Sequence, residues 1–421
     1  MPLSPTQVGH VIRALAAVLP FSEPADGVLS RYFRQYRQLG VHDRALIAET
    51  VYAILRRKRW LDALAPDASP RRLVLAALVK LRGISLRELT PLLDTDENAW
   101  LKTLKAQPAE TLPLGVQAEF PDWLVDKLRA FLHDADILAL GRAMQAPAPL
   151  DLRVNTLRAN RDDVLNAFGQ DGIAAVPTPY SPLGVRLARK IALNRHPLFL
   201  SGKVEVQDEG SQLLGLLVAP RRRDMVVDFC AGAGGKTLLL GALMHSQGRV
   251  YAFDVSEKRL NQLKPRLKRA GLSNLHPQRI SHENDAKIQR LRGKIDRVLV
   301  DAPCSGLGTL RRNPDLKWRQ SPTSVAELSH KQAAILASAS TLLKTGGRLV
   351  YATCSLLPEE NAHVVEHFLR THPDFRQISC AEVLRAGRID LDTGPYLQLT
   401  PLLHGCDAFF AAVLEKTAPE K

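Results

Sequence analysis

The chain has 421 residues, of which 45% are hydrophobic and 24% are charged, values typical of a folded protein with two or three domains. It contains no run of about 18 apolar residues, so we expect no membrane-spanning helix. Lysine and arginine outnumber the acidic residues 57 to 43, giving a formal charge of +14. This charge favours a polyanionic partner such as nucleic acid, although it also aids solubility.

The N-terminus and the cysteines both bear on the cellular compartment. Residues 1–5 lack the basic segment, apolar stretch and cleavage site of a secretory signal, which predicts a cytoplasmic protein. The five cysteines include no Cys-x-x-Cys pair and suit neither a disulfide framework nor a zinc site. We therefore expect reduced thiols and no bound metal.

Residues 1–145 form the first predicted domain, which is helical. Residues 43–64 and 71–81 carry apolar side chains at helical spacing, and no strand-like alternation interrupts them. The basic run at residues 56–59 either binds phosphate or solvates a helix end, where cations suit the helix dipole. Around residues 144–149 two prolines stop the helical pattern, because each lacks an N–H and restrains the residue before it.

The rest of the chain is predicted to be α/β. Residues 150–155 alternate like a strand and residues 162–168 look helical, so residues 146–203 form a small α/β segment. From residue 204 to 421, short apolar runs alternate with helical stretches. The runs are residues 225–227, 249–253, 297–300 and 348–351. This order is typical of a mostly parallel, doubly wound, Rossmann-like sheet, whose ligands lie beyond the carboxyl ends of the strands.

A glycine-rich turn follows the first of these runs. It comprises Cys230, Ala231, Gly232, Ala233, Gly234, Gly235 and Lys236, and a helical stretch comes next. Such a turn exposes backbone N–H groups and a helix dipole to an anionic ligand. An ATP-binding P-loop needs a glycine where Cys230 stands, and a dinucleotide motif needs its third glycine where Thr237 stands. S-adenosylmethionine is the third ligand class that uses such a turn.

Two acidic residues after later runs are candidates to bind the same ligand. Asp254 ends the second run, at the distance from the glycine turn where a ribose-binding acid belongs. Asp285 follows a weak third strand and either accepts from an adenine amino group or makes an Asx turn. The residues alone leave both interpretations of Asp285 open.

Two cysteines follow successive runs and carry the catalytic hypothesis. Cys304 lies in the segment Asp-Ala-Pro-Cys-Ser-Gly, which begins at Asp301, and Cys354 lies in the segment Thr-Cys-Ser. A lone cysteine is usually a small buried hydrophobe, and we interpret Cys380 and Cys406 in that way. Two cysteines at neighbouring strand ends, flanked by small and turn-forming residues, are hard to explain by packing alone.

With these motifs the chain resembles the Nop/Sun family of RNA cytosine-5 methyltransferases, and within it the bacterial Sun (Fmu, RsmB-type) subfamily that acts on small-subunit (16S) ribosomal RNA. The resemblance covers nearly the whole chain. It rests on the glycine turn, the two cysteine motifs and four further segments: residues 152–156 (Leu-Arg-Val-Asn-Thr), 206–211 (Val-Gln-Asp-Glu-Gly-Ser), 358–361 (Pro-Glu-Glu-Asn) and 407–410 (Asp-Ala-Phe-Phe).

The resemblance implies a role for each site residue. Cys354 is the nucleophile, Cys304 helps to release the product, and Asp301 binds the target base. Residues 230–236 with Asp254, Asp285 and Asp301 line the S-adenosylmethionine pocket. The N-terminal domain is similar to the NusB-like RNA-binding domain of the subfamily.

The implied chemistry explains why a cysteine is needed. Carbon 5 of cytosine is a poor nucleophile, and a thiolate that adds to carbon 6 activates it.

Residues 146–203 are expected to bind RNA, and a basic surface is expected from residues 56–59 across Arg153 to the cleft. The expected partner is 16S ribosomal RNA or a partly assembled small subunit, with no DNA and no membrane.

The sequence departs from the family pattern at two places. The usual Ala-Ala-Pro-Gly-Gly-Lys is here Ala-Gly-Ala-Gly-Gly-Lys at residues 231–236, which loosens the turn and predicts altered cofactor affinity. Ala408 replaces a glycine.

Two rival functions remain open. In a DNA cytosine-5 methyltransferase Cys304 would be the nucleophile, but the Thr-Cys motif and the basic helical domain argue against it. A non-catalytic RNA-binding or assembly factor is the other rival, and the intact cysteines and aspartates argue against that.

Overall fold

The computed structural model describes residues 3–106 and 112–418. Met1 and Pro2, which belong to the segment in which we predicted no secretory signal, lie outside the described residues. The chain forms two compact units. The first comprises residues 1–147 together with 309–322, and the second comprises residues 148–308 and 323–421.

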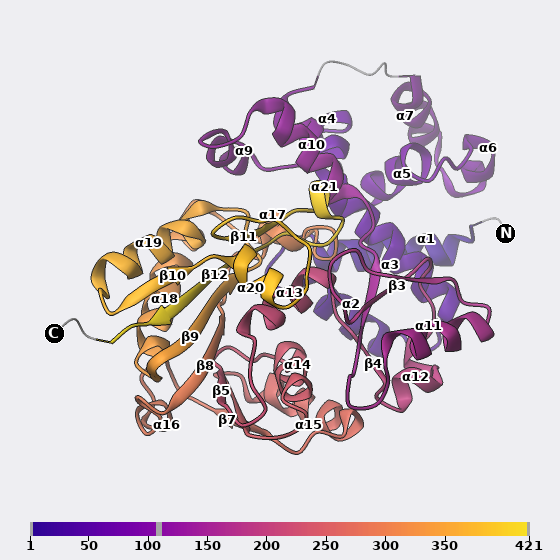
Figure 1. Cartoon of the computed structure of the whole chain (residues 1–421). Helices are drawn as coiled ribbons and strands as arrows, with labels where there is room; N and C mark the ends of the chain where they lie inside the picture. The colour runs from indigo at the N-terminus through magenta and orange to yellow at the C-terminus, as the bar shows by residue number, and fades with distance from the viewer. Residues whose placement is uncertain (1–2, 107–111, 419–421) are drawn as a thin grey trace. The chain divides into compact units, whose positions relative to one another are not determined.

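The first unit is helical, as predicted (Figure 1). Its elements are α1 (Pro5–Val18), α2 (Ala25–Gln35), α3 (Val41–Arg56), α4 (Lys58–Leu64), α5 (Pro70–Lys80), α6 (Leu86–Leu89), α7 (Thr95–Ala106), α8 (Leu114–Ala118), α9 (Asp122–Arg129), α10 (Asp134–Gln145) and α17 (Leu316–Arg319), with the 3-10 turn η1 (Thr90–Leu92). Helix α1 begins with a capping box between Ser4 and Gln7. Helix α5 is buried from Leu73 to Val79 and forms the centre of the unit's core.

Residues 309–322 belong to the helical unit although they lie between strands of the second unit in sequence. Lys317 of α17 is 4% exposed and donates to the carbonyl oxygens of Arg56 at 3.0 Å and Glu119 at 2.8 Å. Its ammonium also lies 3.4 Å from the Glu119 carboxylate. Burial lowers the pKa of Lys317 to about 8 and raises the pKa of Glu119. A buried ion pair thus attaches this segment to the N-terminal helices.

The basic run at residues 56–59 makes contacts within the helical unit, and its binding of phosphate stays a prediction. Arg56 donates to the Arg311 carbonyl, Arg57 pairs with Glu119, Lys58 pairs with Asp62, and Arg59 binds Asp122 and the Phe120 carbonyl. All four side chains are partly buried. Lys58 pairs within α4 at a spacing of four residues, whereas the partners of the three arginines lie far away in the sequence, which local spacing does not reveal.

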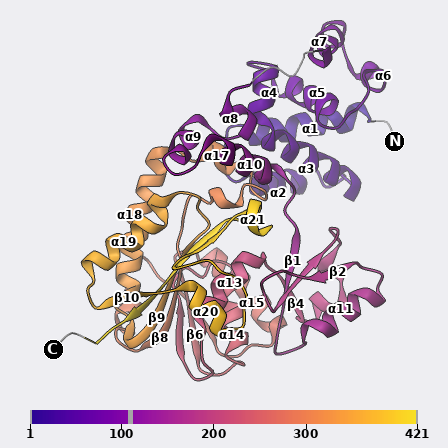
Figure 2. The same ribbon diagram turned by 45° about the horizontal axis from the view of Figure 1, so that its top comes forward.

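The second unit begins with a small antiparallel sheet of order β2-β3-β1-β4 (Figure 2). Its elements are β1 (Leu150–Val154), α11 (Arg161–Gln170), β2 (Ala175–Pro177), β3 (Gly184–Leu187), η2 (Leu193–Arg195), α12 (Pro197–Leu200) and β4 (Val204–Val206). The strand predicted at residues 150–155 and the helix predicted at residues 162–168 are both present. Val164 and Phe168 of α11 pack on Leu152, Val154 and Val185 of the sheet.

A larger sheet forms the rest of the second unit, and among the described residues its strand order is β10-β12-β9-β8-β5-β6-β7. Its strands are β5 (Met225–Asp228), β6 (Arg249–Asp254), β7 (Leu275–Arg279), β8 (Ile295–Asp301), β9 (Leu343–Thr353), β10 (Phe375–Ile378), β11 (Leu397–Leu399) and β12 (Phe409–Lys416). Strands β5 to β9 pair in parallel, whereas β10, β11 and β12 pair antiparallel. All four predicted apolar runs are strands of this sheet.

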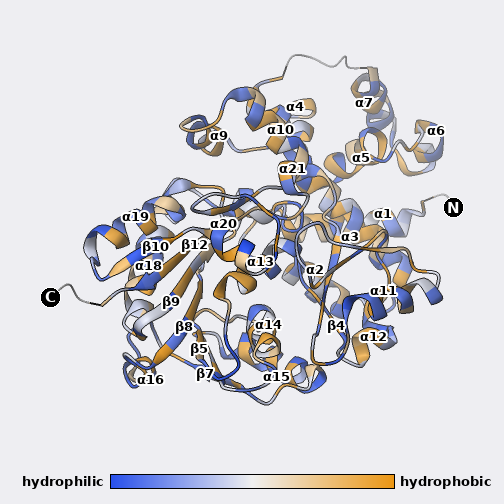
Figure 3. Ribbon diagram, in the orientation of Figure 1, coloured by the Kyte–Doolittle hydropathy of each residue, from blue (hydrophilic) through white to orange (hydrophobic). Residues whose placement is uncertain are grey.

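Two hydrophobic clusters cover the faces of the larger sheet. Helices α13 (Glu209–Val218), α14 (Gly235–Leu243), α15 (Glu257–Ala270) and α20 (Cys380–Ala386) belong to one cluster. Helices α18 (Pro322–Ser340) and α19 (Ala362–Thr371) belong to the other. Figure 3 shows hydrophobic colour along the strands between them. The remaining short elements are α16 (Ala286–Gln289), η3 (Leu307–Thr309), η4 (Pro358–Glu360) and α21 (Pro401–His404). This layering is the predicted doubly wound fold.

In the residues that the structure describes, no helix combines the length and the apolar character that crossing a bilayer requires.

Replacing Lys317 by methionine is expected to destabilise the helical unit. The variant leaves the buried Glu119 carboxylate without its ammonium partner, so the free energy of unfolding should fall by about 3–5 kcal/mol. Urea unfolding followed by circular dichroism measures the change. Lys58→Met is the matched control, because its more exposed pair with Asp62 is worth only about 0–1 kcal/mol. Equal losses in the two variants would contradict the role given to Lys317.

Candidate functional site

The predicted site residues gather at one edge of the larger sheet because its strands are parallel. Asp228, Asp254, Asp301 and Thr353 end β5, β6, β8 and β9. Carboxyl ends of parallel strands meet at the same edge, so the segments that follow them share one site.

The glycine turn between β5 and α14 is closed by backbone hydrogen bonds. The Ala231 N–H donates to the Phe253 carbonyl, and the Gly234 N–H donates to the Ala231 carbonyl, both at 2.8 Å. Gly234 has a φ of +81°, and a side chain there would collide with Leu263. Glycine is therefore required at the position that caps α14.

Two arginines hold the glycine turn from outside, a contact that sequence reasoning missed. Arg153 of β1 donates to the Gly235 carbonyl at 2.7 Å and to the Gln207 side chain. Arg266 of α15 donates to the Ala233 carbonyl and pairs with Glu205 at 3.5 Å. The placement of Arg153 on an RNA-binding surface was wrong, because this residue is 3% exposed and burial lowers its pKa to about 10. The only signal in the sequence was its place in the Leu-Arg-Val-Asn-Thr segment.

Asp228 ends β5, and Cys230 is the first residue of the turn. The Thr237 hydroxyl donates to one Asp228 oxygen at 2.7 Å, and burial raises the pKa of Asp228 to about 7. Burial also raises the pKa of the Cys230 thiol well above its usual value. Cys230 packs against the hydrophobic cluster that contains α18. Its thiol is therefore neutral and belongs with the packing of the turn.

Asp254 connects the glycine turn to the end of β6. Its carboxylate accepts from the Gly232 N–H at 2.8 Å and from the Ser256 N–H at 2.7 Å. A carboxylate offers about four lone-pair positions, so two remain for a ligand.

Asp285 has both of its carboxylate oxygens engaged in local hydrogen bonds. It caps α16, accepting from the Lys287 N–H and from the N–H and hydroxyl of Ser281, each at 2.9 Å. These bonds lower its pKa to about 2, with the Lys287 N–H as the largest cause. The geometry favours the turn interpretation of Asp285, and its contact with adenine stays a prediction.

Lys236 and Asp301 form an ion pair beside the cysteines. The Lys236 ammonium lies 2.7 Å from an Asp301 oxygen. Burial alone would lower the pKa of Lys236, but the charges of Asp301 and Cys354 outweigh it and raise that pKa. Lys236 therefore stays positively charged near Cys354.

Cys304 and Cys354 lie together, with their sulfur atoms 3.4 Å apart. The hydrogen bond with Cys354, followed by burial, the charge of Cys354 and then the charge of Glu360, raises the pKa of Cys304 well above its usual value. Cys380 and Cys406 are fully buried, as the packing interpretation expected.

The Pro-Glu-Glu-Asn segment supplies further site residues to which sequence reasoning gave no role. Glu360 accepts from the Ser305 N–H at 2.8 Å and also binds the Ser355 hydroxyl. The Asn361 side chain binds the Thr353 hydroxyl and donates to the Ser355 carbonyl at 3.1 Å. The signal was the presence of two acids and an amide just after the Thr-Cys motif.

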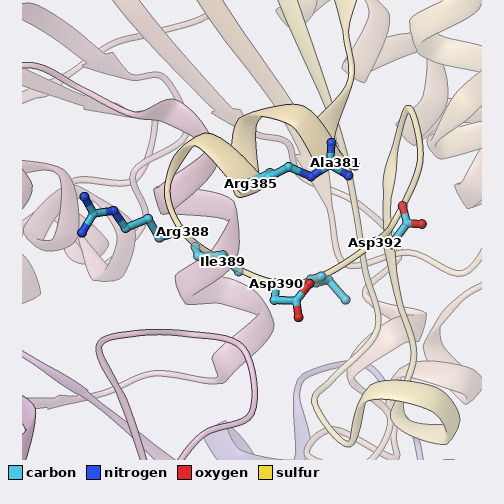
Figure 4. Close-up of a pocket in the computed structure, with 7 residues that line it drawn as sticks. Ala381, Arg385, Arg388, Ile389, Asp390 and Asp392 are labelled. Carbon is cyan, nitrogen blue, oxygen red and sulfur yellow. The ribbon is translucent and has the colours of Figure 1, made fainter.

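A hollow of about 250 Å³ beside α20 contains none of the predicted site residues. It is lined by Arg385, Arg388, Asp390 and their neighbours, and the labelled side chains point in different directions (Figure 4). This divergence offers no convergent set of polar groups to a ligand.

Sequence comparisons identify one family. Residues 215–415 match the family described as 16S rRNA methyltransferase RsmB/F, and residues 120–194 match its ferredoxin-like domain. A probable ribosomal RNA small subunit methyltransferase B of Synechocystis is 32% identical over 91% of this chain and 93% of its own. Ribosomal RNA small subunit methyltransferase B of Pectobacterium carotovorum is 31% identical over 97% of this chain and 96% of its own.

Solved structures share the fold. The crystal structure of PH0851 has a TM-score of 0.79 at 24% identity, covering 99% of this chain and all of its own. A methyltransferase homolog from Pyrococcus horikoshii has a TM-score of 0.63 at 27% identity, covering 74% of this chain and all of its own. Full-length similarity to the two curated enzymes, together with the site at the strand ends, leads to one conclusion: the chain belongs to the RsmB/F family of ribosomal RNA small subunit methyltransferases.

Proposed function

We propose that the protein uses S-adenosylmethionine to methylate carbon 5 of a cytosine in RNA, with Cys354 as the covalent nucleophile. The observation that carries this proposal is the pairing of Cys354 with Cys304 at 3.4 Å, with the Lys236 and Asp301 ion pair beside them. Such a reaction has one addition and one elimination step, and two neighbouring thiols can supply the attacking group and a proton donor to the departing sulfur.

The glycine turn fits the cofactor. Gly232 has a φ of +56°, and open space lies where a side chain would stand, so a ligand can approach the backbone closely. Asp254 retains lone pairs for the ribose hydroxyls, and α14 directs its N-terminal N–H groups toward the turn. When bound, S-adenosylmethionine supplies the electrophilic methyl group. Solved structures with this fold include NSun6 from Pyrococcus horikoshii with SFG, at a TM-score of 0.63 and 19% identity.

The residues of this chain activate the cytosine ring. The Cys354 thiolate forms a bond to carbon 6, and the electron pair of the carbon 5–carbon 6 double bond becomes available at carbon 5. Asp301 accepts from the exocyclic amine of the base, while the Lys236 charge favours the attacking thiolate. Once carbon 5 carries the methyl group, its proton passes to water, the electron pair of that bond re-forms the carbon 5–carbon 6 double bond, and the sulfur–carbon 6 bond breaks to return the Cys354 thiolate.

The assignment of the two cysteines follows from their surroundings. A nucleophilic cysteine reacts as the thiolate, and Lys236 is a cation beside Cys354. Cys304 has a strongly raised pKa and so keeps its proton, which it can donate to the Cys354 thiolate as that sulfur departs. In the DNA-type alternative Cys304 would attack, and its neutral state disfavours that mechanism.

The substrate class is inferred from charge and from the relatives. The net charge of +14 suits RNA, and the related enzymes are named for the small ribosomal subunit. We therefore propose 16S ribosomal RNA, free or in a partly assembled small subunit, as the substrate. This substrate would place the enzyme in the cytoplasm. Its target base must leave the stack to reach Cys354.

Replacing Arg266 by methionine is expected to weaken cofactor binding. The variant removes the hydrogen bond to the Ala233 carbonyl, and a bond from a charged group contributes about 1.5–3 kcal/mol. Part of this energy stabilises the bound form of the turn, so affinity for S-adenosylmethionine should fall roughly threefold to tenfold in calorimetry. Arg259→Met, at an exposed position of the same helix, is the control and should bind normally. Unchanged affinity in Arg266→Met would show that the hydrogen bond from Arg266 to the Ala233 carbonyl does not affect cofactor binding.

Replacing each cysteine by alanine is expected to separate their roles. Cys354→Ala forms no covalent adduct, so methyl transfer should fall by roughly a thousandfold or more. Cys304→Ala still attacks and methylates but fails to eliminate, so a protein–RNA adduct should accumulate. Denaturing gel electrophoresis with a loop cytosine, radiolabelled cofactor and each variant measures both effects.

Cys380→Ala is the control for this experiment, because its sulfur is buried against the Ala411 carbonyl. It should retain activity and form no persistent adduct. A persistent band from Cys354→Ala, with none from Cys304→Ala, would reverse the assignment and favour the DNA-type mechanism. Absence of methyl transfer in the unmodified protein would favour the non-catalytic alternative.

A further inference from the structure

A buried carboxylate connects the loops that carry the two reactive cysteines. Glu360 is fully buried, and its Oε1 accepts from the Ser305 N–H at 2.8 Å and from the Gln332 amide at 3.0 Å. Its Oε2 accepts from the Ser305 hydroxyl at 2.6 Å and from the Ser355 hydroxyl. One side chain therefore receives hydrogen bonds from two loops that are about fifty residues apart in the sequence.

The two serines transmit this contact directly to the cysteines. Ser305 follows Cys304 and Ser355 follows Cys354, and the two hydroxyl oxygens lie 3.2 Å apart. Movement of Glu360 would therefore move both sulfur atoms. The backbone of Glu360 is itself held in place, because its carbonyl accepts from the Tyr351 hydroxyl at 2.6 Å.

The charge of Glu360 acts on the Cys304 thiol. The four donors to Glu360 named above are neutral groups, so they satisfy its oxygens without cancelling its charge. The Glu360 charge raises the pKa of Cys304, whereas Cys354 interacts with the ammonium of Lys236. Tyr351 also interacts with Cys304, and burial raises the Tyr351 pKa, so this residue stays neutral. In a site of low dielectric, such fixed charges decide which member of a close pair is ionised.

We propose that Glu360 is a positioning residue that holds the Cys304 and Cys354 loops against each other and keeps the proton of the thiol pair on Cys304. It thereby leaves Cys354 as the nucleophile. This inference rests on the proposed assignment of Cys354, but it concerns the free enzyme and needs neither RNA nor cofactor to be tested.

Thiol alkylation tests the inference on the whole chain. The protein is treated with iodoacetamide from pH 6 to pH 10, and peptide mass spectrometry gives the alkylation rate of each cysteine. In the unmodified protein Cys354 should react first. In Glu360→Gln, which has the same shape without the charge, Cys304 alkylation should shift to lower pH by about one unit, a tenfold change in thiolate fraction at a given pH. Glu360→Asp keeps the charge, so the order of alkylation should be restored.

Glu366→Gln is the matched control, because it makes the same exchange at an exposed position of α19 and should change neither rate. If Glu360→Gln does not fold, as judged by circular dichroism, Ser355→Ala removes one loop contact and should still slow methyl transfer at unchanged substrate KM. A folded Glu360→Gln protein whose Cys304 profile matches that of the unmodified protein would overturn the inference. Failure of the Cys354 assignment itself would appear separately, as methyl transfer by Cys354→Ala.

Discussion

Parallel pairing of β8 with β9 is the constraint on which the candidate site depends. In this register Asp301 lies opposite Ala352, so both chains leave the sheet at the same edge and Cys304 and Cys354 follow side by side. The loop after Cys304 then folds back, and the Gly308 N–H donates to the Cys354 carbonyl at 2.8 Å. The backbone of Ala408 passes so close to Gly308 that a side chain at that glycine would collide with it. The separation of the two sulfur atoms is thus set by backbone pairing rather than by the cysteines themselves.

Within this frame, the electrostatic environment distinguishes two residues that are chemically identical. Lys236, paired with Asp301, is a cation near Cys354, and the charge of Glu360 raises the pKa of Cys304. Because the site is buried, interactions between these charges are stronger than they would be in water. The surroundings of Cys304 thus favour its neutral form, and the proposed nucleophilic role of Cys354 depends on its position near Lys236.

The glycine turn is also held by side chains from distant parts of the chain. Members of the Nop/Sun family commonly have a proline where Ala233 stands, and a proline restricts the backbone locally. Here Arg153 and Arg266 bind the carbonyls of Gly235 and Ala233 from β1 and α15. Burying a guanidinium is costly, but Gln207 and Glu205 offset that cost with further contacts. The turn is held by these tertiary contacts, and position 233 lacks the local covalent restraint of a proline.

The sequence by itself determined the elements whose signals are local. Apolar runs predicted the parallel strands, the cluster of glycines predicted the turn before α14, and the Pro-Cys and Thr-Cys motifs located Cys304 and Cys354. Periodicity and turn chemistry depend on near neighbours, so they can be read along the chain.

Only the tertiary structure decided which charged side chains are buried and with what partners. Arg153 was predicted on a surface and is inside, the arginines of residues 56–59 bind groups distant in the sequence, and residues 309–322 join the N-terminal unit through Lys317 and Glu119. Glu360 gained its role in the same way, by meeting Ser305 and Ser355 across the sheet edge. Such pairings depend on distances between segments far apart in the chain, and a charged residue has the same sequence signature whether it faces water or a buried partner.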